Sequence, residues 1–252
     1  MLYEVYQHLT TPCPRPIKDI GYLRELIGMA ARYKRCRGAW QPHLEHCQDW
    51  IIQAMEGCRG RVVVLGSGLL YDVPLKSLSD HFDEVVLVDI LHMPALRKAV
   101  GALPNVTLET RDITGFVEPL YRHVRHGAPM PLPGPADILA AHADLVISLN
   151  VLSQLAILPS QFADLEPAIA QSLMQAHLDA LQQSNTRVCL ITEVEQQLCL
   201  NGAVVEKEDP LAGVAIPQDL KVRMARWDWH FAPHPERHPR YDLVYRVEGY
   251  LR

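Results

Sequence analysis

The stretch Arg61-Val-Val-Val-Leu-Gly-Ser-Gly-Leu-Leu70, followed by Glu84-Val-Val-Leu-Val-Asp89, decides the fold. Val62–Leu65 is an unbroken apolar run, which is typical of a strand buried on both faces. The glycines after it allow a sharp turn and a close approach of the backbone to a ligand. A second apolar run ends at Asp89, whose carboxylate can accept hydrogen bonds from two ribose hydroxyls. The pattern predicts an α/β sheet with a pocket for an adenosine-containing cofactor.

The glycine spacing departs from the dinucleotide fingerprint. Gly66 and Gly68 are present, but Tyr71 stands where a third glycine or alanine is typical. This departure disfavours NAD and suits a cofactor without a pyrophosphate. A turn without any ligand is the alternative, and the spacing from the turn to the strand-end acid argues against it. Asp72 and Pro74 are expected to begin the next helix, as its N-cap and an early first-turn residue.

Composition excludes several classes of protein. The chain has 252 residues, and 48% of them are apolar, which is enough for a sizeable core. Its formal net charge is −5 with dispersed Lys and Arg, so nothing indicates a nucleic-acid partner. No apolar stretch approaches the ~20 residues of a membrane span, and the start of the chain lacks a secretory signal pattern. The 6 scattered cysteines indicate reduced thiols. We therefore expect a cytoplasmic protein without a membrane partner.

The chain before the glycine turn predicts a cap. Residues 1–18 contain several prolines and threonines and are expected to form a loose arm. Helical periodicity indicates one helix from Asp19 to Gly38 and a second from Pro42 to Gly57. We expect residues 1–58 to be an arm and helical cap on the substrate side of the pocket, and residues 59–252 to be the cofactor-binding core.

Two residue spacings suggest metal ligands. Cys36, Cys47 and Cys58 are equally spaced, with His43 and His46 nearby, but the predicted break at Gly38 and Pro42 separates the first two. Buried small hydrophobic residues are the better interpretation. Near the end of the chain three histidines recur at every fourth position, and the prolines between them prevent the helix that would align them. We expect no metal site. The three histidines are His230, His234 and His238.

Polar residues follow two further predicted strands. Asp112 comes after Val106–Glu109, and its carboxylate can meet the amino edge of an adenine while Ile113 packs on the ring. Ile90 is an equivalent apolar contact next to Asp89. The alternative, which is compatible, makes Asp112 the N-cap of the following helix. Asn150 follows the strand Leu145–Leu149, and ligands bind at such carboxyl ends of parallel strands.

The rest of the chain predicts one more parallel strand and two hairpins. Arg187–Thr192 indicates the fifth strand, with Glu193 and Glu195 at its end. Asn201-Gly202 between apolar runs is a strong hairpin pattern. Apolar residues alternate with polar ones around Trp227–Phe231 and Leu243–Val247, which predicts a final antiparallel pair.

This order of elements resembles the class I S-adenosylmethionine-dependent methyltransferase family over roughly residues 59 to 250. The family has a glycine-rich turn after its first strand, an acid at the end of the second, an acid after the third and a polar residue after the fourth. It closes with a β-hairpin whose last strand is antiparallel. The residues that match these positions are Gly66, Ser67, Gly68, Asp89, Asp112 and Asn150.

The resemblance implies a Rossmann-like, mostly parallel, seven-stranded sheet and S-adenosylmethionine as the cofactor. The methyl group would go to a small or medium-sized molecule that the sequence does not identify. Glu193, Glu195 and His230 are the candidate bases. Val64 stands where the family usually has an acid, and Leu70 where it has a small residue. A methyltransferase-fold binding or scaffold protein without catalysis is therefore the alternative, ahead of an NAD-dependent oxidoreductase.

Overall fold

The computed structural model describes residues 2–252, and the side chains from Glu4 onward. Its centre is a sheet with the strand order β3-β2-β1-β4-β5-β8-β7, and β6 pairs with β5 outside this path. Neighbours among β1–β5 are parallel, whereas β8 is antiparallel to both β5 and β7. The predicted Rossmann-like, mostly parallel sheet with a terminal antiparallel hairpin is confirmed. It has 8 strands instead of the expected seven, because β6 adds to the end of β5. The strands are β1 (Arg61–Leu65), β2 (Glu84–Asp89), β3 (Val106–Thr110), β4 (Leu145–Leu149), β5 (Arg187–Leu200), β6 (Ala203–Glu208), β7 (Arg223–Ala232) and β8 (Asp242–Leu251).

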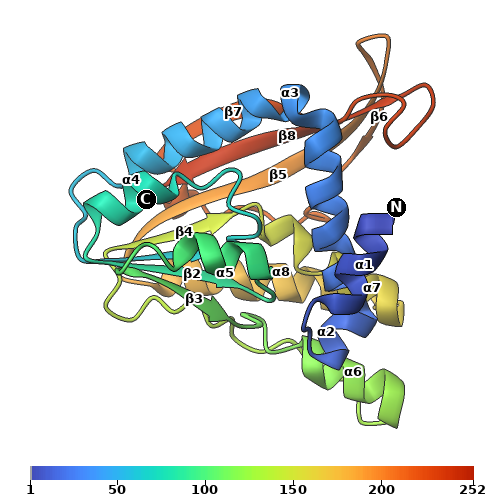
Figure 1. The fold of residues 1–252 in the computed structure, drawn as a ribbon, viewed down its shortest axis with the longest axis horizontal. Helices are drawn as coiled ribbons and strands as arrows, with labels where there is room; N and C mark the ends of the chain where they lie inside the picture. Colours follow the sequence, from blue (N-terminus) through green and yellow to red (C-terminus); the bar gives the residue numbers. More distant parts are fainter. Residues whose placement is uncertain (1) are drawn as a thin grey trace.

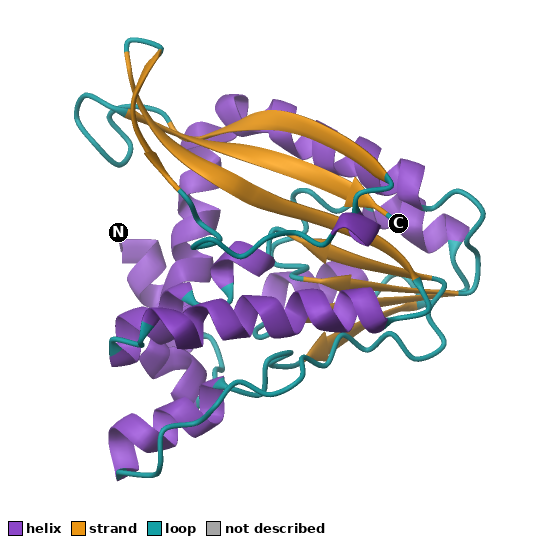
Figure 2. Cartoon of the chain, turned by 180° about the vertical axis from the view of Figure 1, so that it is seen from behind, coloured by secondary structure: helices purple, strands orange, loops and turns teal. Residues whose placement is uncertain are grey.

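Helices cover both faces of the sheet, which explains the unbroken apolar runs in its central strands. Val62 and Val64 point into the core below α3, α4 and α5, while Val63 and Leu65 point into the core below α8. Figure 1 shows the first face and Figure 2 the opposite face, which α8 crosses. These helices and their neighbours are α4 (Leu75–His81), α5 (Pro94–Val100), α6 (Val117–His126), α7 (Ile157–Ala163) and α8 (Pro167–Gln183).

The start of the chain is helical, so the expectation of a loose arm is wrong. Residues Leu2–Thr10 form α1 and Arg15–Ile20 form α2. Pro14 is the N-cap of α2, and the next proline lies in its first turn. First-turn N–H groups have no partner within the helix, so a proline there costs no hydrogen bond. Ile20 is buried against α6 and α7, and that burial stabilises so short a helix.

One long helix, α3 (Tyr22–Ala54), replaces the two helices predicted from Gly38 and Pro42. Both residues lie inside the helix. The chain bends instead at Cys36, whose backbone has φ −107° and ψ 16°. Proline lacks an N–H and its ring crowds the preceding turn, so a bend on the N-terminal side of Pro42 is expected. Figure 1 shows the result: the first part of α3 stands beside the sheet edge, and the second part lies across β7 and β8.

The fifth strand is longer than predicted. It continues past Thr192 to Leu200, because its second half pairs with β6 on one side and β8 on the other. The turn between β5 and β6 is the predicted Asn201-Gly202, and both residues have positive φ, 51° and 81°. Glu193 and Glu195 therefore lie inside a strand, on either side of an irregularity in its pairing with β8.

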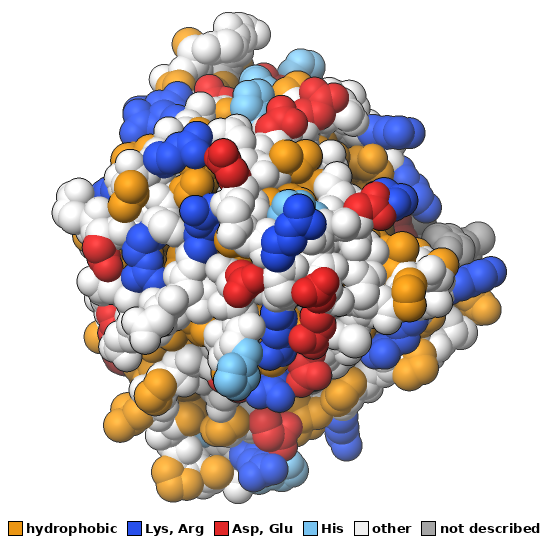
Figure 3. Space-filling view, turned by 90° about the vertical axis from the view of Figure 1, so that its left-hand side faces the viewer, with side chains coloured by type: hydrophobic (Ala, Val, Ile, Leu, Met, Phe, Trp, Pro, Cys, Tyr) orange, Lys and Arg blue, Asp and Glu red, His pale blue; other side chains and the backbone are white. Residues whose placement is uncertain are grey.

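Two further observations concern the whole described chain. All six cysteines are free thiols. Among the described residues, no helix combines the length and the apolar character needed to cross a membrane. On the surface shown in Figure 3, acidic and basic side chains are interspersed.

Candidate active site

The strand register places the predicted site residues along one edge of the sheet. Leu65 pairs with Val88, and Leu149 pairs with Ile191, so the residues after β1, β2 and β4 and the middle of β5 lie side by side. Asp89 pairs with Thr110, which places the segment after β3 in the same row. Figure 1 shows α1, α2, α6 and α7 gathered beyond this edge.

The glycine turn requires glycine at its first position. Gly66 has φ +78°, and a Cβ there would lie 2.6 Å from the carbonyl oxygen of Leu149 and 2.9 Å from the Cβ of Val151. Gly68 also has positive φ, and its N–H donates to Asp89 Oδ2 over 2.7 Å. The turn therefore passes close to β4 and is tied to the acid that ends β2.

Asp89 has hydrogen-bonding capacity left for a ligand. The N–H of Leu91 lies 3.4 Å from its other carboxylate oxygen, Oδ1, which is a long hydrogen bond, and the N–H of Ile90 also bonds to this carboxylate. Burial raises the pKa of Asp89, and the hydrogen bond from Gly68 opposes that shift. A carboxylate with one oxygen fixed and the other weakly bonded suits the ribose hydroxyls of a nucleoside. Ile90 beside it is half-buried against the cap residues.

The Ser67 side chain points away from the predicted pocket. It is fully buried, and its hydroxyl lies 3.3 Å from Nε2 of His92. His92 also contacts the Thr110 hydroxyl through Nδ1 at 3.0 Å. Burial and, second, the charge of Arg97 lower the pKa of His92 to about 4, so the ring is neutral at pH 7. Ser67 can contact a cofactor through its backbone only.

The N-cap of α6 is Phe116 and not Asp112, so the alternative prediction for Asp112 is wrong in position. Its carboxylate nevertheless binds N–H groups of the turn that leads into α6. Its Oδ1 accepts from the N–H of Thr114 and its Oδ2 from the N–H of Val117, both over 2.9 Å. Oδ1 also accepts from the Thr114 hydroxyl over 2.6 Å, so only Oδ2 keeps a lone pair, and an adenine contact stays a prediction. Ile113 is buried in the core under α8.

The sequence interpretation missed Tyr22, the first residue of α3. Burial raises the pKa of Tyr22, and the nearby charges of Asp112 and Asp89 raise it further. The ring therefore lies near both acids that are expected to meet the adenosine. Gly21, with φ +113°, joins α2 to α3 and places Tyr22 there. A glycine followed by an aromatic residue at a helix start was the available sequence pattern.

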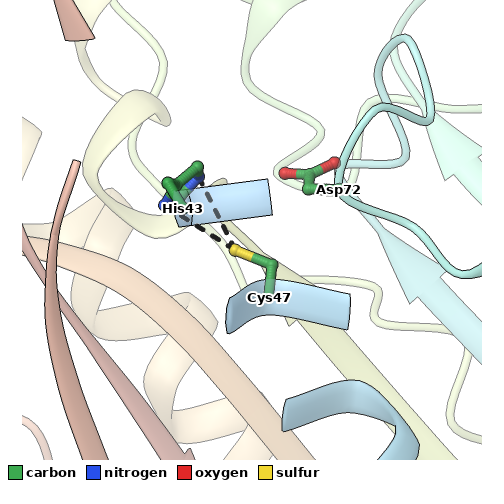
Figure 4. A group of neighbouring side chains, drawn as sticks. All are labelled: His43, Cys47 and Asp72. Atoms are coloured by element: carbon green, nitrogen blue, oxygen red, sulfur yellow. Dashed lines mark hydrogen bonds between the residues drawn. The ribbon is translucent and has the colours of Figure 1, made fainter. Parts of the chain in front are cut away.

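Beside the glycine turn, the structure brings together a group of polar side chains, here called the polar cluster. The helix α3 supplies two members, the loop after the glycine turn supplies one, and the segment from β4 through η1 (Leu152–Gln154) together with β5 supplies three. Figure 4 shows the first three of them pointing toward one another. The members of the polar cluster are His43, Cys47, Asp72, Asn150, Ser153 and Glu193.

Asn150 links the glycine-turn loop to β4. Its Nδ2 donates to Asp72 Oδ2 over 2.9 Å, and its backbone is left-handed, with φ +48°. Its Oδ1 is buried and has no hydrogen-bond partner among the described residues. The prediction that Asp72 is the N-cap of α4 is wrong, because its side chain turns inward to Asn150. The N-cap is Pro74.

The two acids of the polar cluster have raised pKa values. Burial raises the pKa of Glu193 to about 7, against the hydrogen bond that Ser153 donates to it. Burial likewise raises the pKa of Asp72 to about 6, against the hydrogen bond from Asn150. In the described part of the chain no Lys or Arg forms an ion pair with either acid. An acid of pKa near 7 is suited to accepting a proton at neutral pH.

His43 is held as a neutral ring. Its Nδ1 accepts a hydrogen bond from the Trp227 indole N–H over 3.0 Å, and burial lowers its pKa to about 3. The single ring proton is therefore on Nε2, which lies 3.6 Å from the sulfur of Cys47. A ring nitrogen of His43, the sulfur of Cys47 and a carboxylate oxygen of Asp72 all lie within 4.8 Å of one another, close enough to suggest a metal site. A protonated Nε2 offers no lone pair to a metal ion, so a hydrogen-bond network describes this group better.

The other two candidate bases lie elsewhere. Glu195 is bonded to Lys207 at 3.0 Å, and Arg246 lies 3.8 Å away. His230 is exposed on β7, on the surface opposite the buried Trp229. Of the three predicted bases, the structure brings only Glu193 to the polar cluster.

No family model and no curated protein sequence matches this chain. Several solved structures are similar to it. The DhpI–SAM–HEP complex has 12% identity and a TM-score of 0.45, over 96% of this chain and 100% of that one. The 1,6-didemethyltoxoflavin-N1-methyltransferase of Burkholderia thailandensis, with bound S-adenosylhomocysteine, has 15% identity and a TM-score of 0.45, over 94% and 91%. A SAM-dependent methyltransferase of Leishmania major has 11% identity and a TM-score of 0.40, over 99% and 82%.

Proposed function

We propose that the protein is an S-adenosylmethionine-dependent methyltransferase that acts on a small or medium-sized molecule. One observation carries this proposal: the glycine turn is hydrogen-bonded to Asp89, and Asn150 and Glu193 lie at the same sheet edge. These are the positions where a nucleoside, an amino-acid moiety and a methyl acceptor would need binding groups.

The residues present fit this cofactor. Asp89 Oδ1 would accept from the ribose, and Ile90 and Ile113 would offer apolar surface to the adenine. The unpartnered Oδ1 of Asn150 would accept from the α-ammonium group. When bound, the cofactor supplies a sulfonium methyl group. The protein's contribution is to align the acceptor, to exclude water and to take up a proton.

The runner-up is a binding protein that has kept the fold without catalysis. Val64, where the family usually has an acid, is fully buried in the core under α3. Leu70, where a small residue is usual, has a strained φ of +61°. Such a protein would bind the cofactor and show no turnover with any acceptor. An NAD-dependent oxidoreductase is disfavoured, because β8 is antiparallel and Tyr71 replaces the third glycine.

Calorimetry with S-adenosylmethionine, S-adenosylhomocysteine, NAD+ and NADH tests the proposal. We expect both sulfur compounds to bind and neither nicotinamide to do so. Asp89→Ala should weaken cofactor binding by roughly tenfold to a thousandfold, because one or two charge-assisted hydrogen bonds of ~1.5–3 kcal/mol each are lost. Glu84→Ala, at the exposed amino end of the same strand, is the matched control and should leave affinity unchanged. Heat from NADH alone would overturn the proposal.

A further inference from the structure

The polar cluster contains more acceptors than donors. Glu193 accepts one hydrogen bond from the Ser153 hydroxyl, and Asp72 accepts one from Asn150 Nδ2. Each carboxylate also accepts from its own backbone N–H, which leaves about half of its four or so acceptor sites unused. The buried Oδ1 of Asn150 accepts none among the described residues. What this group lacks is N–H or O–H donors.

The neighbouring side chains do not supply them. The side-chain donors of Ser153 and Asn150 are already used within the cluster. The Nε2–H of His43 faces Cys47 rather than either acid. The Cys47 thiol, which burial keeps protonated, offers only one weak S–H donor near Asp72. Within residues 4–252, no Lys or Arg pairs with Asp72 or Glu193. Buried acceptors without donors are costly, by about 1–3 kcal/mol for each unsatisfied group.

The charge of the cluster selects among methyl acceptors. Carboxylate, phosphate, phenolate and thiolate acceptors are anions, which two buried carboxylates would repel. An amine supplies two or three N–H donors and carries positive charge both when protonated and after methylation. Two carboxylates without a cation of their own stabilise that charge.

We propose that the methyl acceptor is an amine whose nitrogen binds between Asp72 and Glu193. This inference rests on the proposed function and names its substrate class. Asp72 and Asn150 lie beside the glycine turn, whereas Glu193 lies on the next strand, β5. When bound, the cofactor's own ammonium group would use Asn150 Oδ1, and the acceptor nitrogen would lie between the carboxylates of Asp72 and Glu193.

The reaction balances with these groups. An ammonium substrate gives one proton to the Glu193 carboxylate and becomes the free amine. The nitrogen lone pair then forms the new N–C bond while the C–S bond of the sulfonium breaks and its electron pair goes to sulfur. The positive charge moves from sulfur to nitrogen, near the Asp72 carboxylate, and Glu193 returns its proton to water.

Binding to protein saturated with S-adenosylhomocysteine tests the proposal, because the cofactor's ammonium position is then filled. The probes are matched trios of amine, alcohol and carboxylate on butyl, benzyl and indolylethyl skeletons, measured by calorimetry at pH 8. We expect at least one amine to bind ten times more tightly than its alcohol, and the carboxylates not to bind. If no amine binds, or if an alcohol or carboxylate equals its amine, the proposal is overturned.

Variants connect the selectivity to the cluster. Glu193→Gln should remove the amine preference by tenfold or more and leave S-adenosylhomocysteine affinity within threefold. Glu248→Gln is the matched control, because Glu248 is also buried but pairs with Arg226 through its side chain. An amine preference that survives Glu193→Gln would contradict the proposal.

The same titrations without S-adenosylhomocysteine separate this inference from the proposed function. Amine selectivity that depends on Glu193, in a protein that binds neither sulfur compound, would support the amine site and reject the methyltransferase. Binding of the sulfur compounds without amine selectivity would support the methyltransferase and reject the amine site.

Discussion

Gly66 is a residue whose identity is fixed by two independent constraints. Its φ of +78° disfavours any side chain, and a Cβ would overlap the Leu149 carbonyl oxygen at 2.6 Å. Gly66→Ala should therefore lower the free energy of unfolding by roughly 2–4 kcal/mol, from strain and overpacking together. Thermal and urea unfolding measure the loss. Gly68→Ala is the control: its nearest neighbour would be 3.8 Å away, so only the cost of positive φ, about 1 kcal/mol, is expected. Equal losses in both variants would contradict this account.

Glu193 links stability to pH. Its pKa is about 7 in the folded protein and about 4.3 in an unfolded chain, so its contribution is complete below pH ~4 and is lost as pH rises through 7. Glu193→Gln stays neutral and keeps an acceptor for Ser153. Relative to wild type, this variant should gain roughly 1–3 kcal/mol of stability between pH 4.5 and pH 8. Urea unfolding at both pH values gives the difference, and a pH-independent effect would show that Glu193 ionises normally.

Sequence reasoning reached some site residues and missed others for a physical reason. Gly66, Asp89 and Asn150 follow buried strands, and the register of a parallel sheet brings strand ends together whatever the side chains are. Asp72 was taken for an N-cap, because local sequence does not show that its side chain turns inward to Asn150. Sequence alone predicts Glu193 as a strand-end acid, but not its burial beside Ser153, which belongs to another segment of the chain.

Among the elements, α3 is the one that joins cap to core. Its buried residues belong to the same apolar core as β1 and β7, so the proposed cap of residues 1–58 cannot be removed without exposing that core. A chain of residues 58–252 should aggregate and lose cofactor binding. A chain of residues 21–252 keeps α3 and should stay monodisperse, with a lower melting temperature because Ile20 and its contacts are lost. Size-exclusion chromatography and thermal unfolding distinguish the two. A soluble 58–252 chain with unchanged melting would contradict this role of α3.

The boundaries of elements were predicted less well than the elements themselves. Gly38 and Pro42 indicate a helix end, and both lie inside α3. The cost of a proline in a helix, about 3 kcal/mol, is offset here by tertiary contacts that the local sequence does not contain. Trp40 packs on Phe231, with ring centroids 5.6 Å apart, and its indole N–H donates to the Phe231 carbonyl over 2.8 Å.

Across the whole molecule, the two ends of the chain share one core. Trp50 on α3 lies against Gly249 on β8, where a Cβ would be 2.7 Å from the indole nitrogen. His43 stacks on Trp229 with centroids 4.1 Å apart. The same helix thus packs on the terminal hairpin and supplies His43 and Cys47 to the polar cluster. Any change that shifts the hairpin should therefore be felt at the proposed acceptor site.

Three buried histidines set the acid stability of the whole protein. Burial lowers the pKa of His43 to about 3 and those of His92 and His177 to about 4, against about 6.5 in an unfolded chain. Their contribution is complete above pH ~6.5 and is lost as pH falls toward 4. Because the pKa values of Asp72 and Glu193 are raised, these two acids add stability as pH falls, and that gain is complete near pH 4. Three histidines outweigh two acids, so we expect a net loss of stability that begins near pH 6.5 and continues to about pH 4.

His177 offers the sharpest test of that acid loss. Its Nε2 bonds to the Ser148 hydroxyl over 2.8 Å, and its Nδ1 has no partner among the described residues, so protonation brings a buried charge with nothing to stabilise it. His177→Gln can keep the bond to Ser148 and cannot be protonated. Between pH 7 and pH 4 this variant should lose roughly 2–3 kcal/mol less stability than wild type. His230→Gln, at an exposed position, should follow the wild-type curve. Parallel curves for wild type and His177→Gln would mean that acid unfolding begins at another group.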